Sequence, residues 1–101
     1  MNYRSTLAQQ IQVLEQKFKD QCIVAHTGGL FHITPELLNQ LSNIKEPAQW
    51  VLDMNQNPIF IEGIANFYRE AYSIYYTALK EFGDNFNALK TRRSVDSLID
   101  L

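Results

Sequence analysis

The feature that most constrains this chain is a helical pattern that continues almost without interruption from Glu62 to about Thr91. As one α-helix it would be about 43 Å long, at about 1.5 Å per residue. A compact domain of about 100 residues has a radius of gyration of only about 13 Å. The helix must therefore project beyond its own domain or break. Gly83-Asp84, a C-terminal cap followed by an N-cap, is the natural break, and the pattern leaves both alternatives open.

Two further helices are predicted in the first half of the chain. Residues from about Ser5 to Gln21 form one apolar stripe at helical spacing, made of Leu7, Ile11, Leu14 and Phe18. A short helix follows Thr34, which can act as its N-cap, and begins at Pro35, which suits the first helical position. Its buried side consists of Leu37, Leu38 and Leu41.

Two hairpins are predicted from short segments rich in β-branched and aromatic residues. The first turns at Gly28-Gly29, which pairs His26 with Phe31 and His32 with Ala25, and so places the two imidazoles on opposite faces. The second joins segments 50–54 and 59–61 through a four-residue loop. That loop puts one set of side chains on a common face, namely Leu52, Met54, Ile59 and Ile61, and turns Asp53 and Phe60 the other way.

These elements predict an α+β fold: an N-terminal helix, a small antiparallel sheet of about four strands from two hairpins with a short helix between them, and a long aromatic-rich C-terminal helix. We expect one domain over residues 1–93, followed by an acidic-apolar tail over residues 94–101.

Charge and composition exclude several classes of protein. The chain has 9 basic and 11 acidic residues, a formal charge of −2, which argues against a nucleic-acid-binding protein. No apolar run approaches the roughly 20 residues that span a bilayer, so no membrane association is expected. The start of the sequence has no secretory signal and Cys22 is the only cysteine. The expected location is the cytoplasm.

No residue pattern predicts catalysis, a cofactor or a metal. Cys22, His26 and His32 match no common spacing of zinc ligands. The segment that begins at Asp53 has the D-x-N-x-N opening of a calcium loop, but Pro58 stands where that loop needs glycine and Ile64 where it needs glutamate. Asn and Asp are also common turn residues, so a hairpin turn is favoured there. A protein without enzymatic activity is predicted.

The long helix carries two apolar stripes, and one would suffice to cover the small sheet. The second is either wrapped by the rest of the fold or free for a partner, as a homo-oligomer or with another protein. Because tyrosine combines a large apolar ring with a polar tip, it is common in interfaces. The predicted partner-binding residues of this helix are Tyr68, Tyr72, Tyr75, Tyr76 and Phe86.

The tail from Ser94 to Leu101 alternates acidic and apolar residues and allows two interpretations. It is either a capped final turn folded back on the domain or a short motif that docks into a partner. In the second case its anchors are Leu98, Ile99 and Leu101.

Part of the sequence resembles small proteins of T4-like tailed bacteriophages, cyanophages included. The resemblance covers residues 50–101 and rests on Val51-Leu52-Asp53 with Asn57-Pro58-Ile59, on the tyrosine-rich helix, and on Leu89-Lys90 with Arg93-Ser94-Val95. It implies a structural or virion-assembly protein, located in the cytoplasm of a bacterial host or in the virion. The segment 97–101 is also similar to the clamp-binding tails of replication and late-transcription proteins in these phages, although it lacks their terminal aromatic residue. That similarity implies the alternative, a regulatory adaptor of a sliding clamp or RNA polymerase.

Overall fold

The computed structural model describes residues 6–99, with side chains for residues 6–92. In chain order the elements are α1 (Leu7–Gln21), β1 (Ile23–His26), β2 (Gly29–His32), α2 (Pro35–Asn43), β3 (Gln49–Leu52), β4 (Pro58–Ile61) and α3 (Ile64–Ile99). The predicted α+β fold is confirmed. The four strands form two separate two-stranded antiparallel sheets, one from each hairpin, and not the single sheet of about four strands that was expected.

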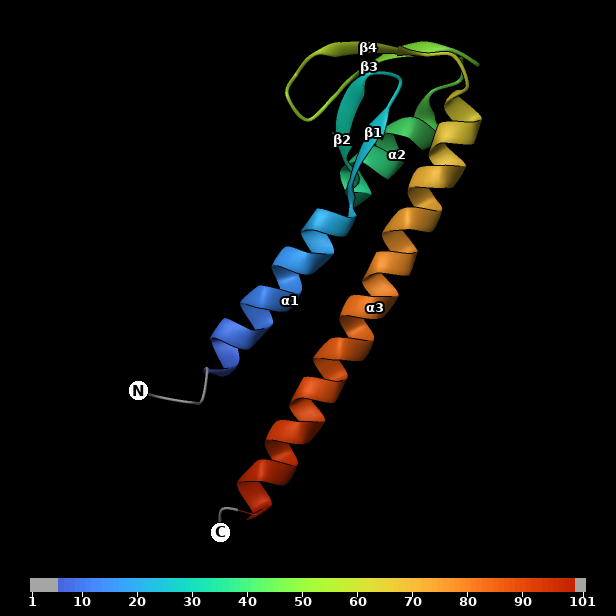
Figure 1. Cartoon of the computed structure of the whole chain (residues 1–101). Helices are drawn as coiled ribbons and strands as arrows, with labels where there is room; N and C mark the ends of the chain where they lie inside the picture. Colours follow the sequence, from blue (N-terminus) through green and yellow to red (C-terminus); the bar gives the residue numbers. More distant parts are fainter. Residues whose placement is uncertain (1–5, 100–101) are drawn as a thin grey trace.

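Helix α3 is continuous through Gly83, so of the two alternatives the projecting helix is the one found. The radius of gyration is 18.3 Å and the extents are 61 × 24 × 16 Å, whereas a compact domain of this length would have a radius of about 13 Å. Figure 1 shows the reason: the hairpins and α2 gather at one end, and α1 and α3 run side by side away from them. We call these parts the head and the arm. The expected boundary between residues 93 and 94 falls inside α3.

The first hairpin has a different register from the predicted one. Its pairs include Val24 with Phe31 and His26 with Gly29, and the two turn residues are Thr27 and Gly28. Both have positive φ, 51° and 82°, as a type I′ turn requires. The pairing of His26 with Phe31 was therefore wrong. The shift is by two residues, however, so the two histidines still lie on opposite faces, as predicted.

The second hairpin is shifted by three residues, which reverses its faces. Val51 pairs with Ile59 and Leu52 with Pro58. The prediction that Leu52 shares a face with Ile61 was wrong: Leu52 is exposed and Ile61 is fully buried. The reason is the turn itself, in which Asp53 is buried beside the strands and its Oδ1 accepts hydrogen bonds from the N–H groups of Asn55 and Asn57, both at 2.9 Å.

The two hairpins are joined at Leu30. Its carbonyl accepts a hydrogen bond from the N–H of Met54 at 2.7 Å, and its own N–H donates to Asp53 Oδ2 at 3.2 Å. Ile59 also lies directly over Gly29, where a Cβ would be 2.6 Å from Ile59 Cγ1. The absence of a side chain at Gly29 thus allows one hairpin to pack on the other.

The first two helices begin at capping residues, of which Thr34 was predicted. The Thr6 side chain accepts a hydrogen bond from the Gln9 N–H and the Gln9 side chain accepts one from the Thr6 N–H, a reciprocal capping box at the start of α1. Thr34 caps α2 in the expected way, with Pro35 at the first helical position.

The hydrophobic core lies mainly in the head. Its buried residues are Cys22, Phe31, Ile33, Leu38, Leu41, Val51, Ile61, Ile64, Phe67, Ala71 and Ala78. By contrast, no residue between Leu7 and Gln21 is buried, so the apolar stripe of α1 is only partly covered by α3. The arm is therefore a pair of helices with apolar surface left over.

Candidate functional site

Helix α3 packs against α1 along one line of residues. These follow one another at alternating steps of four and three and we call them the inner seam: Ala71, Tyr75, Ala78, Phe82, Asn85 and Leu89. Ala71, Ala78 and Leu89 are buried. Phe18 of α1 contacts the rings of Tyr75 and Phe82, at centroid distances of 5.6 and 5.2 Å. This is the spacing with which two helices pack as in a coiled coil.

A second line of residues on α3 has the same spacing, turned by about 100° from the first because each member is one residue further along the helix. We call it the outer seam: Tyr72, Tyr76, Leu79, Gly83, Phe86 and Lys90. Tyr72 is 48% exposed, Tyr76 47% and Leu79 36%. Helix α3 thus carries one seam that α1 covers and one that is largely open to solvent.

Ring contacts connect the two seams into one aromatic chain. From the head outward, its consecutive members are Tyr68, Tyr72, Tyr76, Tyr75, Phe18, Phe82 and Phe86, with centroid distances of 4.6 to 6.3 Å. At its far end Lys90 Nζ lies 5.5 Å from the centroid of the Phe86 ring. Because each ring is supported by the next, the exposed tyrosines belong to a packed array and are not isolated surface side chains.

All five predicted residues of the long helix belong to this aromatic chain. Tyr72 and Tyr76 are exposed, and Tyr68, Tyr75 and Phe86 are half-buried. Tyr75 lies partly under Phe18, and burial, followed by the nearby Tyr76, Cys22 and Glu36, raises the pKa of its hydroxyl. Tyr75 therefore contributes more to the packing of α1 on α3 than to the surface that a partner could contact.

The sequence-based list of site residues omitted members of the aromatic chain and of the outer seam. Phe18 was assigned only to the stripe of α1, and Gly83 only to a possible helix break. A count from Tyr72 that takes the four-residue step first, to Tyr76, would have placed Leu79 and Gly83 in one seam. Of the predicted tail anchors, Leu98 and Ile99 belong to the α3 backbone, but their side chains lie outside the described residues, as does the whole of Leu101.

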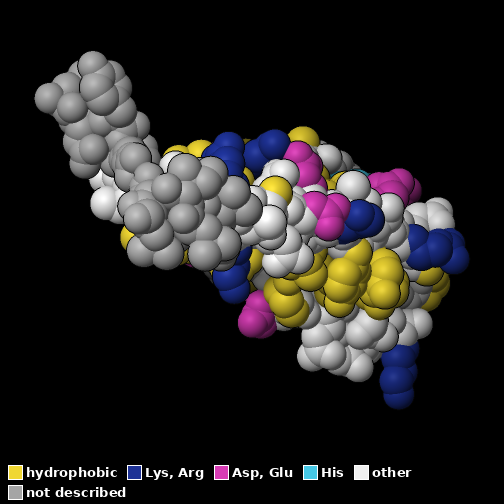
Figure 2. Space-filling view, turned by 90° about the horizontal axis from the view of Figure 1, so that it is seen from below, with side chains coloured by type: hydrophobic (Ala, Val, Ile, Leu, Met, Phe, Trp, Pro, Cys, Tyr) yellow, Lys and Arg dark blue, Asp and Glu magenta, His cyan; other side chains and the backbone are white. Residues whose placement is uncertain are grey.

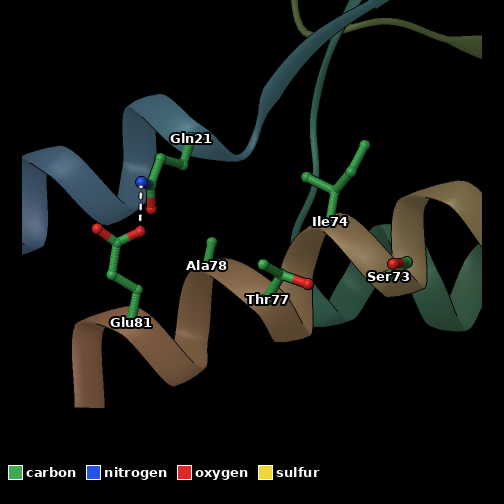
Figure 3. Close-up of a pocket in the computed structure, with 6 residues that line it drawn as sticks. All are labelled: Gln21, Ser73, Ile74, Thr77, Ala78 and Glu81. Carbon is green, nitrogen blue, oxygen red and sulfur yellow. Dashed lines mark hydrogen bonds between the residues drawn. The ribbon is translucent and has the colours of Figure 1, made fainter. Parts of the chain in front are cut away.

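The other flank of α3 makes a hydrogen bond and an ion pair with α1. A pocket of about 290 Å³ lies between the end of α1 and α3. Figure 3 shows the residues that line it, Gln21, Ser73, Ile74, Thr77, Ala78 and Glu81. Glu81 accepts a hydrogen bond from Gln21 Nε2 at 2.7 Å and pairs with Lys17 Nζ at 2.8 Å. Hydrogen bonds from Lys17 and then Gln21 lower the pKa of the Glu81 carboxyl. This flank fastens two elements of the chain, and its carboxylate is already paired.

A smaller apolar surface lies on the head, on the outward face of β3 and β4. Trp50 is 60% exposed, Leu52 54% and Phe60 41%, and the Trp50 and Phe60 rings are 5.2 Å apart. Figure 2 views the molecule from the other end, from below, and shows hydrophobic side chains gathered in a patch on that face, with charged side chains around it.

Three of the residues considered for chemistry take part in packing or in a turn. His26 stacks on Phe67 with centroids 4.3 Å apart, and Cys22 is buried, which raises the pKa of its thiol. Asp53 forms the hairpin turn favoured from the sequence. Within residues 6–92, no group of three or more His, Cys, Asp or Glu side chains could hold a metal ion. None of the described helices is both long and apolar enough to cross a membrane.

Comparisons of the chain with protein-family models, with curated proteins and with solved structures find no match. The function is therefore argued from the surface of the molecule.

Proposed function

We propose that this protein is a non-enzymatic assembly protein that self-associates through the outer seam of α3. The observation that carries the proposal is the exposure of Tyr72, Tyr76 and Leu79 on a line of residues with coiled-coil spacing. Single exposed apolar side chains are ordinary on a protein surface, whereas a continuous apolar line is typical of an interaction site.

The chemistry of the outer seam suits a reversible protein contact. Tyrosine buries a large apolar ring and keeps its hydroxyl within reach of water, so the same surface is tolerated in the free chain and stabilised in a complex. The inner seam supports the choice of a helix as the partner, because the same helix already packs against α1 with the same spacing. A role in virion assembly would agree with the resemblance to phage proteins.

Sedimentation velocity of matched double variants tests the proposal. Tyr72→Gln with Tyr76→Gln removes two rings of the outer seam. Ser73→Gln with Thr77→Gln makes the same change one residue further along, at exposed positions on the other flank of α3. We expect the wild-type chain and the Ser73/Thr77 variant to dimerise at up to about 100 μM and the Tyr72/Tyr76 variant to stay monomeric. A wild-type chain that is monomeric throughout that range, or equal dimerisation of both variants, would contradict the proposal.

A further inference from the structure

We infer that the outer seams of two copies pack antiparallel, with the two α3 helices crossing at Gly83 and the two-fold axis beside it. The inference rests on the proposed self-association and adds to it the orientation of the pair and its point of closest approach.

The first argument is that the isolated chain gives Gly83 no reason to be glycine. It lies inside α3, where glycine destabilises a helix by about 1 kcal/mol relative to alanine. Its φ is not positive. Outside its own helical turn and its chain neighbours, no atom of the described residues lies within 4 Å of the position that a Cβ would take. The missing side chain therefore leaves space that nothing in the described chain uses.

The second argument is the position of Gly83 among large side chains. Leu79 precedes it and Phe86 follows it in the outer seam, and both have much larger side chains than glycine. The result is a low point in an otherwise raised line of apolar groups. Helices approach most closely where one of them lacks a side chain, and a glycine in both copies lets the two backbones meet there.

The third argument is the symmetry of the outer seam about this glycine. Tyr76 lies seven residues before Gly83 and Lys90 seven residues after it, so each is about 10.5 Å away along the same line of the helix. In an antiparallel pair centred on Gly83, Lys90 of one copy therefore lies beside Tyr76 of the other.

The charges favour this orientation over the parallel one. A lysine ammonium is attracted to the face of a tyrosine ring, and Lys90 already lies 5.5 Å from the Phe86 ring in its own chain. A parallel pair would instead bring Lys90 against Lys90, near the following Arg92, and these like charges would repel. Two copies in opposite directions are thus complementary, and two copies in the same direction are not.

Disulfide cross-linking of cysteine variants tests the orientation, with Cys22 retained because it is buried in the core. Gly83→Cys should form a cross-linked dimer with itself under mild oxidation, because its two copies face each other. Tyr76→Cys and Lys90→Cys should each form little dimer alone and a mixed disulfide when combined. Thr77→Cys, on the other flank, should remain uncross-linked. Circular dichroism of each variant checks that it is folded.

The outcomes separate this inference from the proposed function. Efficient self-cross-linking of Tyr76→Cys or Lys90→Cys would overturn the antiparallel orientation. A wild-type dimer in which neither Gly83→Cys alone nor Tyr76→Cys combined with Lys90→Cys cross-links would overturn the crossing point and leave the proposed self-association standing. A monomeric wild-type chain would overturn both.

The Gly83→Ala variant gives a second measurement that does not depend on oxidation. Alanine favours the helix over glycine, so the monomer should unfold at a higher temperature. The added methyl groups meet at the crossing, so the dimer should dissociate about tenfold more readily. Unchanged or tighter dimerisation would overturn the crossing at Gly83.

Discussion

The ring of Phe18 in α1 stacks on the ring of Phe82 in α3, with centroids 5.2 Å apart and planes inclined by 15°. This stack and the edge contact of Phe18 with Tyr75 are the aromatic contacts that join the two helices of the arm in the described part of the chain. Both contacts belong to the aromatic chain, which includes Tyr72, Tyr76 and Phe86 of the outer seam. The stability of the arm and the shape of the candidate site therefore depend on the same side chain.

Phe18→Ala should separate the two helices of the arm. We expect the free energy of unfolding to fall by about 2 kcal/mol, less than for a fully buried phenylalanine because Phe18 is only half-buried. Urea denaturation followed by circular dichroism measures the change. Val13→Ala is the control, because Val13 lies on the same helix and is 68% exposed. An equal effect of both substitutions would show that the Phe18 contacts do not hold the arm.

Gly29→Ala should push the two hairpins apart. The new methyl group would lie 2.6 Å from Ile59 Cγ1 and 3.2 Å from a ring carbon of Phe31, so we expect a loss of about 1 to 3 kcal/mol of stability. Gly63→Ala, whose methyl group would make only ordinary contacts from 3.7 Å outward, is the control. Ile59→Ala should restore part of the stability that Gly29→Ala removes. If the changes in the free energy of unfolding of the two single variants simply add in the double variant, the close approach of Gly29 and Ile59 would be refuted.

Asp53 should make the stability of the head depend on pH in the acid range. The N–H of Asn57, followed by those of Leu30 and Asn55, lowers the pKa of its carboxyl against the opposing effect of burial. Because the pKa is lower in the folded than in the unfolded chain, the stabilisation is present above the unfolded value and is lost as the pH falls through the folded one.

The matching measurement is the melting temperature of the Asp53→Asn variant as a function of pH. An amide offers one acceptor oxygen where the carboxylate offers two, so we expect a decrease of roughly 5 to 15 °C at pH 7. The difference from wild type should shrink between about pH 5 and pH 2. Asp20→Asn controls for the loss of one surface charge, since Asp20 is exposed. A difference that does not change with pH would exclude Asp53 as the titrating group.

Deletion of residues 95–101 should leave self-association intact. The outer seam ends at Lys90, before the deleted residues. We expect a dimer dissociation constant within about threefold of the wild-type value by sedimentation equilibrium. Loss of the dimer on deletion would place the contact in the tail. Loss of the binding of a clamp or polymerase partner, with the dimer unchanged, would support the adaptor role that the tail resemblance implies.

The order and type of the helices and strands could be predicted from the sequence because apolar spacing, capping residues and turn residues indicate the same elements along most of the chain. The spacing of Leu7, Ile11 and Leu14 specifies a helix, and Thr34-Pro35 specifies where the next one starts. The projection of α3 could not be decided, because a glycine inside a helix and a glycine at a helix end look alike in sequence.

The registers of the hairpins could not be predicted because they depend on how each turn is closed. The first turn uses Thr27 at positive φ, an uncommon conformation for a β-branched residue, although Gly29 was available. In the second, Asp53 accepts hydrogen bonds from its own turn and from Leu30 of the other hairpin, a tertiary contact that no local pattern reveals. The predicted surface tyrosines were found together because they lie on one helix, and Phe18 was missed because it comes from another.

Because α3 is long, the distal end of the outer seam lies far from the head. The helix starts at Ile64, buried in the head, and Lys90 lies about 39 Å further along it at about 1.5 Å per residue. A tilt of about 10° where the helix leaves the head would displace Lys90 by about 7 Å. Small changes in how the hairpins pack on Ile64 and Phe67 would thus produce a larger displacement at the distal end of the outer seam.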